Sequence, residues 1–278
     1  MKVITHIIIT LLLISFSSKA WCSETQNHEY KFGVFPYLSS DMMHDIYFPV
    51  SRKLSDELEQ DVKFLTEASH KKFIQRLNNE YYDFVLIPPF WFPVAVDHKQ
   101  YLPALKMAEP FVSLILTLDN STINAVNDLK GKTVSTPPGF SPVVSLITRE
   151  LVDQGLVPGR DVIFKSNETV DECLQQLIDN NSSACISPPY APAHFERKTG
   201  VKLRKILTSA SIPSVALLIH SRVDKESHQK IYNSFLSLDK TPQGRALLQG
   251  MQTKRFIPVV KNEYDVVKDI MKKSKFIH

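Results

Sequence analysis

Short apolar segments alternate with amphipathic segments along most of the chain, and this alternation constrains the fold more than any other feature. The strand-like segments are residues 30–36, 62–66, 83–87, 132–136, 161–165 and 184–187. The segments between them carry apolar residues three or four positions apart, which is the spacing of one face of a helix. Strands that alternate with helices form largely parallel sheets, so the pattern predicts an α/β protein.

The order of these segments indicates two lobes. Two strand–helix–strand–helix–strand series follow one another, and each occupies about 60 residues. The extended apolar segments 111–118 and 214–220 fit strands that leave one lobe and enter the other. We therefore predict two three-layer α/β lobes joined by two crossover strands, with residues 27–112 and 217–278 in lobe 1 and residues 113–216 in lobe 2. The alternative is one continuous doubly wound sheet.

The N-terminus has the order of a secretory signal peptide: the cationic Lys2, an apolar run at residues 7–16, and small residues up to Ala20. We expect residues 1–20 to be cleaved and the mature chain to reach the periplasm. The apolar run is short for a helix that spans a bilayer. Three alternatives stay open: cleavage after Cys22, a lipid anchor on Cys22, and an uncleaved membrane anchor.

Charge and motif content argue against several classes of protein. The formal net charge is +4, and it falls to +2 when cleavage removes Lys2 and Lys19. Since no block of Lys and Arg is present, we expect no nucleic-acid partner. The sequence has no GxSxG, HExxH, GxGxxG or phosphate-loop motif, and its His, Cys and Asp residues lack metal-ligand spacing. We therefore expect no catalytic residue, no metal and no cofactor, and we do not expect an enzyme.

Two cysteines of the mature chain are candidates for a disulfide. Cys173 falls on the apolar face of an expected helix, and Cys185 lies in the strand that follows. An exported protein can oxidise such a pair. The alternative is that both are buried thiols that pack as small apolar side chains.

The candidate ligand-binding residues lie where the expected strands end, because ligands of open α/β sheets bind beyond the carboxyl ends of the strands. These candidates are Tyr37, Ser39, Ser69, His70, Pro89, Phe90, Trp91, Ser135, Thr136, Gly139, Phe140, Ser141, Ser187 and Tyr190. Three strand ends carry a Pro-Pro pair with an aromatic residue nearby, which suits a partly apolar or cationic ligand. The alternatives are that Phe90, Trp91 and Phe140 belong to the core, and that His70 is an exposed residue at a helix start.

Several motifs in order resemble a known family. They are Asp83 to Pro89 (DFVLIPP), Asp128 to Val134 (DLKGKTV), Thr241 to Leu248 (TPQGRALL) and Phe256 to Pro258 ahead of Tyr264. From Phe32 to Tyr264 the chain resembles the periplasmic solute-binding proteins of phosphonate, phosphite and phosphate ABC importers. The resemblance implies a type II-like two-lobed fold and a monomer that captures a small ligand and delivers it to an inner-membrane ABC permease. Two alternatives are a ligand-sensing partner of a membrane sensor kinase and an enzyme on the same fold.

The chain departs from this family in the residues expected to bind the anion. The resemblance implies an oxyanion at a Ser/Thr-Ser-Gly turn that begins a helix, and the corresponding residues 135–142 include three prolines, which lack N–H donors. His70 stands where the family has a Tyr, and Val170 where it has a His. We therefore expect weak binding of phosphate, phosphite and simple alkylphosphonates. An organic ligand that stacks on the aromatic residues is expected to bind better.

Overall fold

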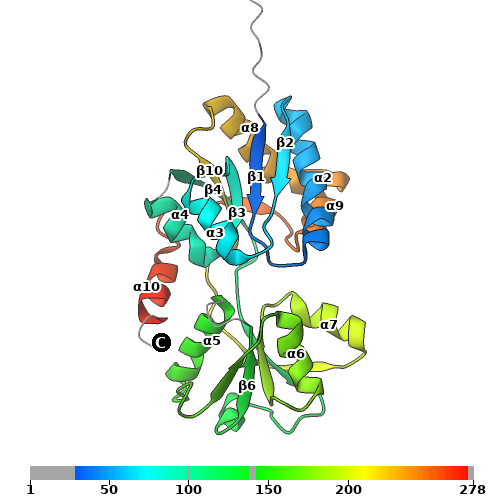
Figure 1. Cartoon of the computed structure of the whole chain (residues 1–278), viewed down its shortest axis with the longest axis vertical. Helices are drawn as coiled ribbons and strands as arrows, with labels where there is room; N and C mark the ends of the chain where they lie inside the picture. Colours follow the sequence, from blue (N-terminus) through cyan, green and yellow to red (C-terminus); the bar gives the residue numbers. More distant parts are fainter. Residues whose placement is uncertain (1–28, 99, 138–141, 275–278) are drawn as a thin grey trace, which may run out of the picture.

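In the computed structural model, the described residues are 29–98, 100–137 and 142–274. They form two separate sheets, which Figure 1 shows as two lobes stacked along the long axis of the molecule. This architecture confirms the predicted two-lobed α/β fold, whereas the single continuous sheet is wrong. The expectations for the signal peptide and for Gly139, Phe140 and Ser141 fall outside the described residues.

The first sheet has six strands in the order β11-β4-β10-β3-β1-β2. They are β1 (Tyr30–Val34), β2 (Val62–Leu65), β3 (Phe84–Ile87), β4 (Tyr101–Met107), β10 (Ala216–His220) and β11 (Phe256–Pro258). The second sheet has five strands in the order β7-β6-β8-β5-β9. They are β5 (Leu114–Leu118), β6 (Thr133–Thr136), β7 (Ile163–Ser166), β8 (Ala184–Ser187) and β9 (Leu203–Thr208).

Both sheets are mixed rather than largely parallel. The strands of each strand–helix series pair in parallel, with β1 between β2 and β3 and with β6 between β7 and β8. By contrast, β10 pairs antiparallel with β3, and β5 pairs antiparallel with β8. The expectation of largely parallel sheets is therefore correct for the two series only, because the chain enters each sheet from the other lobe in the opposite direction.

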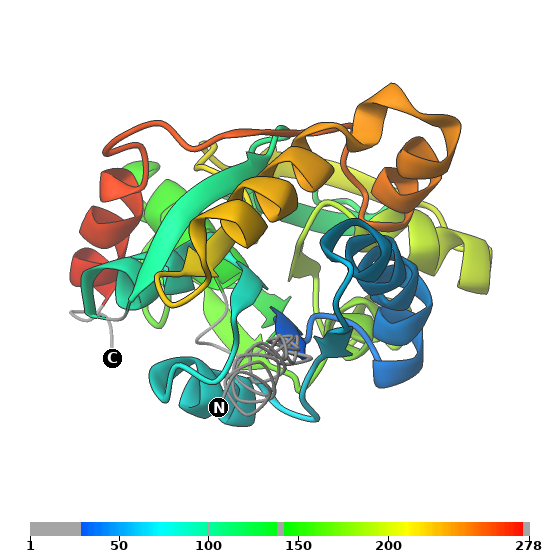
Figure 2. The ribbon, with the colours of Figure 1, turned by 90° about the horizontal axis from the view of Figure 1, so that it is seen from above.

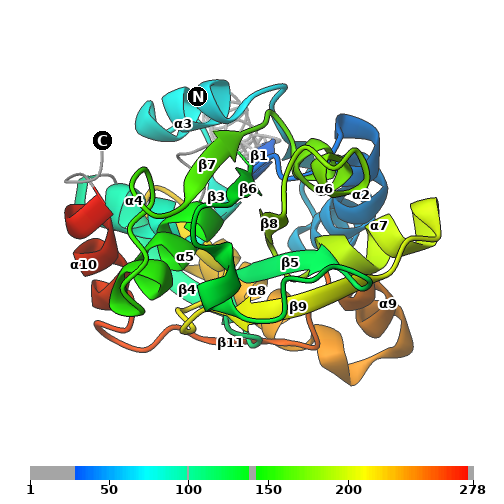
Figure 3. The ribbon, with the colours of Figure 1, turned by 90° about the horizontal axis from the view of Figure 1, so that it is seen from below.

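Helices cover both faces of each sheet. They are α2 (Ser40–Leu58), α3 (His70–Asn78), α4 (Phe92–His98), α5 (Pro142–Asp153), α6 (Val170–Ile178), α7 (Ala191–Thr199), α8 (Lys225–Leu236), α9 (Pro242–Gly250) and α10 (Asp265–Ser274), with short 3-10 helices η1 (Pro89–Trp91), η2 (Val126–Leu129) and η3 (Leu238–Lys240). Figure 2 shows blue α2 and orange α9 on the opposite side of lobe 1 from red α10. Figure 3 shows α5 on one side of the second sheet and α6 with α7 on the other.

The alternation of side chains along β3 explains why lobe 1 has three layers. Phe84 and Leu86 join the core beneath α2, α8 and α9, whereas Val85 and Ile87 join the core beneath α3, α4 and α10. Successive strand residues point to opposite faces of a sheet, so a strand that is apolar at every position requires cover on both faces. The second sheet is covered in the same way.

Helix α2 contains a proline in its interior. Pro49 lies well inside this helix, which begins at Ser40. The buried residues Met43, Tyr47 and Val50 continue one helical face through the proline. Burial of this face offsets the backbone hydrogen bond that a proline cannot donate within a helix.

Two antiparallel segments connect the lobes. The expected crossover strands 111–118 and 214–220 lie mostly inside one sheet each, as β5 and β10, and the connection itself is the stretch that precedes each strand. There Phe111 and Ile212 exchange two backbone hydrogen bonds of 2.9 and 3.0 Å. The predicted lobe boundaries, after residues 112 and 216, lie in or next to these segments and stay a prediction.

The C-terminal helix α10 contacts both lobes. It packs against η1 of lobe 1 and against α5 of lobe 2. Leu146 of α5 shares one apolar cluster with Val267 and Ile270 of α10. Tyr264, just before α10, donates its hydroxyl hydrogen to the carbonyl oxygen of Ser214 in the second crossover segment (2.7 Å). The C-terminal helix therefore contacts both lobes, and its predicted assignment to lobe 1 stays a prediction.

A disulfide joins Cys173 of α6 to Cys185 of β8, with 5.8 Å between the two Cα atoms. Both residues are fully buried in the apolar cluster between α6, α7 and the second sheet. The bridge therefore attaches α6 to the strand on which it packs. None of the helices in the described parts of the chain is long and apolar enough to cross a membrane.

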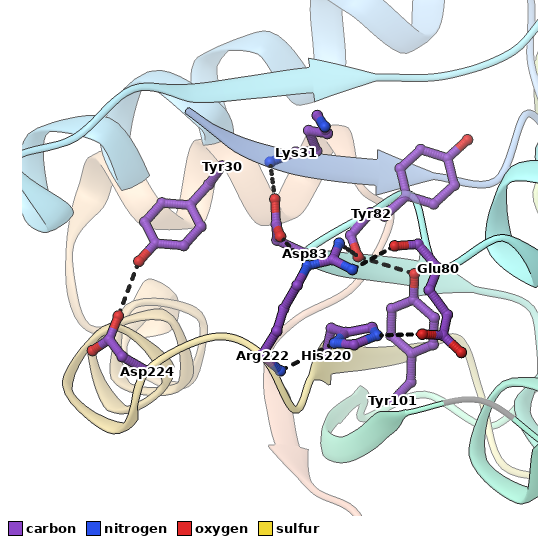
Figure 4. Close-up of polar contacts among 9 residues, drawn as sticks. All are labelled: Tyr30, Lys31, Glu80, Tyr82, Asp83, Tyr101, His220, Arg222 and Asp224. Atoms are coloured by element: carbon purple, nitrogen blue, oxygen red, sulfur yellow. Dashed lines mark hydrogen bonds and ion pairs between the residues drawn. The ribbon is translucent and has the colours of Figure 1, made fainter. Parts of the chain in front are cut away.

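A charged cluster lies at the amino ends of β1 and β3, at the far end of lobe 1 from the strand ends considered below (Figure 4). Arg222 donates from Nε to the carboxylate of the buried Asp83 (2.7 Å), which also accepts from the backbone N–H of Lys31 (2.7 Å). His220 accepts at Nδ1 from the backbone N–H of Arg222 (3.1 Å), and its Nε2 lies 3.3 Å from Glu80. Burial and the nearby guanidinium lower the pKa of His220.

Candidate ligand-binding site

The carboxyl ends of the parallel strands of the two lobes meet at an aromatic contact. Tyr37 follows β1 of lobe 1, and Tyr190 follows β8 of lobe 2. Their rings meet edge to face, with 5.9 Å between the ring centroids. We use "interlobe face" for residues 35–40, 66–70 and 88–91 of lobe 1 together with residues 136–137, 166–170 and 187–190 of lobe 2. This is the position in which open α/β sheets bind ligands.

The phenol groups at this contact are uncharged at neutral pH. Burial raises the pKa of Tyr37 and of Tyr190, and it raises the pKa of the fully enclosed Tyr47 of α2 well above its ordinary value. The hydroxyl oxygens of Tyr37 and Tyr47 lie 3.0 Å apart and share a hydrogen bond. The Tyr190 hydroxyl has no hydrogen-bond partner among the described residues. Tyr37 and Tyr190 therefore offer neutral hydrogen-bonding groups rather than charges.

His70 is oriented by lobe 1 itself. It is the first residue of α3, and its Nε2 donates to the carbonyl oxygen of Pro36 (2.8 Å) while its ring stacks on Phe35 at 4.7 Å. The preceding Ser69 accepts from the backbone N–H of Lys72 (3.3 Å) and so caps the helix. Both side chains therefore stabilise the start of α3, which places the imidazole at the interlobe face.

Ser39 lies at the start of α2, where its side chain is exposed and makes no capping hydrogen bond. Its backbone carbonyl accepts from the N–H of Met43 (2.9 Å). The Ser39 hydroxyl is thus open to solvent and does not cap the helix.

The hydroxyl groups predicted in lobe 2 are largely used inside that lobe. Ser135 and Thr136 of β6 are buried, and Ser135 Oγ lies 3.0 Å from Ser182 Oγ. Ser187 donates to the carbonyl oxygen of Pro188 (3.0 Å). Their position at strand ends agrees with the sequence, but their hydrogen bonds support the strand ends rather than an open site.

Asn167 was missed by sequence reasoning, although it directly follows β7. Its side-chain amide donates to the carbonyl oxygens of Thr136 and Lys165 (both 3.0 Å) and to Ser135 Oγ (3.3 Å). Carbonyl oxygens accept only, so these contacts fix which side of the amide carries the N–H groups. The available signal was a polar residue two positions after the predicted strand 161–165.

The aromatic and proline residues after β3 divide between the core and the interlobe face. Pro89 and Phe90 are buried, and Phe90 packs in the core beneath α3 and α4 with 9% of its surface exposed. Phe90 is therefore a core residue, which is the alternative that the sequence left open. Trp91 is half-buried and packs against the same core.

Glu67 is an acidic residue next to β2 that sequence reasoning also missed. Its side chain is buried and forms ion pairs with Arg76 and Lys72, the second at 3.4 Å. Its charge is therefore balanced within lobe 1. In the same segment, the buried Thr66 hydroxyl has no hydrogen-bond partner within the described parts of the chain.

No group of three or more His, Cys, Asp or Glu side chains among the described residues is arranged to hold a metal ion. A hollow of about 240 Å³ lies at the crossover segments instead of at the strand ends. It is lined by Lys106, Met107, Ala108, Pro110, Ser211, Ile212, Pro213 and Ser214. Lys106 and Met107 end β4 and the other residues belong to the connection between the lobes, so the hollow lies at the joint.

Comparison with known families agrees with this arrangement. A family model described as "ABC transporter, phosphonate, periplasmic substrate-binding protein" matches residues 32–264, and the chain belongs to this family. The protein is therefore a substrate-binding protein of the ABC-transporter type, and the family is one of transport-associated binding proteins, not of enzymes. None of the curated proteins matches the chain in sequence.

Solved structures show the same fold at low sequence identity. PhnD1 from Prochlorococcus marinus in complex with methylphosphonate has a TM-score of 0.76 and 15% identity, over 89% of this chain and 98% of that chain. A binding protein component of an ABC phosphonate transporter from Pseudomonas aeruginosa has a TM-score of 0.75 and 14% identity, over 90% and 88%. The aliphatic sulphonate binding protein SsuA from Escherichia coli has a TM-score of 0.65 and 14% identity, over 90% and 94%.

Proposed function

We propose that the mature protein works in the periplasm, where it captures a small organic ligand between its lobes and delivers it to an inner-membrane ABC permease. Family membership supports the transport role, and the N-terminal pattern of Lys2, the apolar run and Ala20 supports export. N-terminal sequencing of protein isolated from the periplasmic fraction of cells tests the export step. The expected product starts after residue 20, and an intact N-terminus would contradict it.

The observation that carries this proposal is the contact of strand ends from two separate sheets, with a two-stranded joint beside them. The crossover segments are held to each other by the Phe111–Ile212 pair, so rotation of the lobes requires changes at only a few backbone positions. Such a joint supports closure of the lobes on a ligand. The ligand is proposed to bind at the interlobe face, with His70, Tyr37 and Tyr190 as its neighbours.

The side-chain donors of this face support an organic ligand over a small tetrahedral anion. The donating groups of His70, Asn167 and Ser187 are engaged with carbonyl oxygens of their own lobes. The prolines at 137, 138 and 142 lack N–H donors. The loss of two charge-assisted hydrogen bonds costs about 3–6 kcal/mol, which corresponds to roughly hundredfold to more than ten-thousandfold weaker binding.

Native mass spectrometry of protein purified without refolding identifies a bound ligand directly. With that ligand added back, we expect the radius of gyration in solution scattering to decrease while the far-ultraviolet circular dichroism stays unchanged. Unchanged scattering at saturation would contradict closure.

Titration calorimetry with phosphate, phosphite and methylphosphonate tests the ligand class separately. We expect weak binding of all three anions. A submicromolar dissociation constant for any one of them would contradict the argument from the missing donors.

A further inference from the structure

The contact between Tyr37 and Tyr190 joins residues from the two lobes at the interlobe face. Each residue follows the carboxyl end of a parallel strand, β1 for Tyr37 and β8 for Tyr190. The two rings are inclined at 65° with 5.9 Å between centroids, and both side chains are half-buried. Because the strands belong to different sheets, the distance between these rings depends on how far the lobes are closed.

The surroundings fix Tyr37 more firmly than Tyr190. The Tyr37 hydroxyl is hydrogen-bonded to Tyr47, and its ring packs edge to face on the Tyr47 ring with 6.4 Å between centroids. Tyr190 precedes α7, packs against the apolar cluster beneath α6 and α7, and has a hydroxyl without a partner among the described residues. A half-buried hydroxyl with no protein partner gains a hydrogen bond when a ligand brings an acceptor to it.

We propose that Tyr37 and Tyr190 form the recognition pair for the organic part of the ligand, and that the ligand is a phosphonate or similar acid that carries a flat apolar group. This inference rests on the proposed function and names its ligand class. The two rings supply apolar surface from both lobes, and a flat apolar group of a ligand can pack against such rings. The Tyr190 hydroxyl donates to an oxygen of the acid group.

The uncharged state of both phenols fits this role. Burial raises the pKa of each, so neither carries a negative charge that would repel an anionic ligand. Two side-chain donors near them, those of His70 and Asn167, are used within their own lobes. Selectivity is therefore expected to come from the organic group, with the acid group contributing less than it would at a site rich in free N–H donors.

Phenylphosphonate and methylphosphonate form a matched pair of probes, because they share the acid group and differ only in the organic group. By titration calorimetry, we expect the wild-type protein to bind phenylphosphonate about tenfold or more tightly than methylphosphonate. Tyr190→Ala removes the ring and should reduce this ratio to about threefold or less. Tyr190→Phe keeps the ring and removes the hydroxyl, so it should weaken both ligands by about threefold to tenfold and leave their ratio unchanged.

The matched controls are Tyr81→Ala and Tyr81→Phe. Tyr81 lies before β3, at the opposite end of lobe 1, where its ring is covered by Lys31 and Arg76. Both control variants should retain the wild-type affinities. Circular dichroism and thermal unfolding of all four variants establish that each one is folded before binding is measured.

Three results would overturn the inference. They are equal binding of the two phosphonates by the wild type, an unchanged ratio in Tyr190→Ala, and no binding of either phosphonate. Native mass spectrometry separates the last result from a failure of the proposed function. A different small molecule found in the purified protein would keep the binding-protein function and overturn only this ligand class, whereas protein that never carries or binds a small molecule would count against both.

Discussion

The hydrogen bond from Tyr264 to the second crossover segment offers a direct test of how the C-terminal helix is coupled to the joint. Tyr264 is 2% exposed, and its hydroxyl donates to the carbonyl oxygen of Ser214 over 2.7 Å. Its ring stacks on Phe92 with 3.7 Å between centroids. Burial raises the pKa of this phenol, so it remains a donor throughout the neutral range.

The substitution Tyr264→Phe keeps the ring and deletes only the hydroxyl. A buried hydrogen bond contributes about 0.5–1.5 kcal/mol, and a buried carbonyl oxygen left without a donor costs about 1–3 kcal/mol. Since Ser214 is itself buried and its carbonyl oxygen loses this donor, we expect a loss of about 1–3 kcal/mol in the free energy of unfolding. Hydrogen exchange at residues 209–215 should also become faster, because the segment loses a contact that holds it.

Urea unfolding followed by circular dichroism measures the first effect, and mass spectrometry of hydrogen exchange measures the second. The control is Tyr232→Phe on α8, because Tyr232 is partly buried and its hydroxyl has no hydrogen-bond partner among the described residues. The free energy of unfolding of this control variant should stay within about 0.5 kcal/mol of the wild-type value. If Tyr264→Phe proves no more destabilising than the control and exchange at the joint is unaffected, the hydroxyl does not couple α10 to the crossover segment.

Three further changes probe the two lobes. Arg222→Met leaves the buried carboxylate of Asp83 without its cation. Because Arg222 is partly exposed, we expect the free energy of unfolding to fall by about 1.5–3 kcal/mol. Urea unfolding measures this loss, with the exposed-site variant Arg245→Met as the control. Asp224 has a pKa lowered to about 2 by hydrogen bonds from Ser227, so its stabilisation is complete above pH 4 and is lost as pH falls towards 2. Asp224→Ala should therefore lower the free energy of unfolding by about 0.5–2 kcal/mol at pH 7 and by much less at pH 2. An equal loss at both pH values would show that the charged carboxylate of Asp224 does not stabilise the helix start. Thiol counting on unfolded, unreduced protein should find neither Cys173 nor Cys185 reactive. Replacement of both cysteines should lower the free energy of unfolding by about 2–3 kcal/mol, because the disulfide closes a short loop.

Local apolar patterns predicted the strands of the two strand–helix series, including β2 and β7 at the sheet edges, whereas β4, β9 and β11 were missed. Every residue of β3 and β8 is buried, so an unbroken apolar run identifies them. In β9 no residue is buried, and β11 has three residues of which one is buried, so neither carries a periodic signal. β4 contains Pro103 and exposed Leu102, which hide it from pattern analysis.

The sequence by itself determined which residues stand at the strand ends, because a strand end is set by a few neighbouring residues. Tyr37, His70, Ser187 and Tyr190 all lie where the pattern placed them. Only the tertiary structure decided which of them stay available to a ligand. The imidazole of His70 binds a carbonyl 34 positions away in sequence, and Ser135 meets a hydroxyl 47 positions away. The Tyr37–Tyr190 contact requires two sheets to be brought together, and no local pattern encodes a distance between lobes.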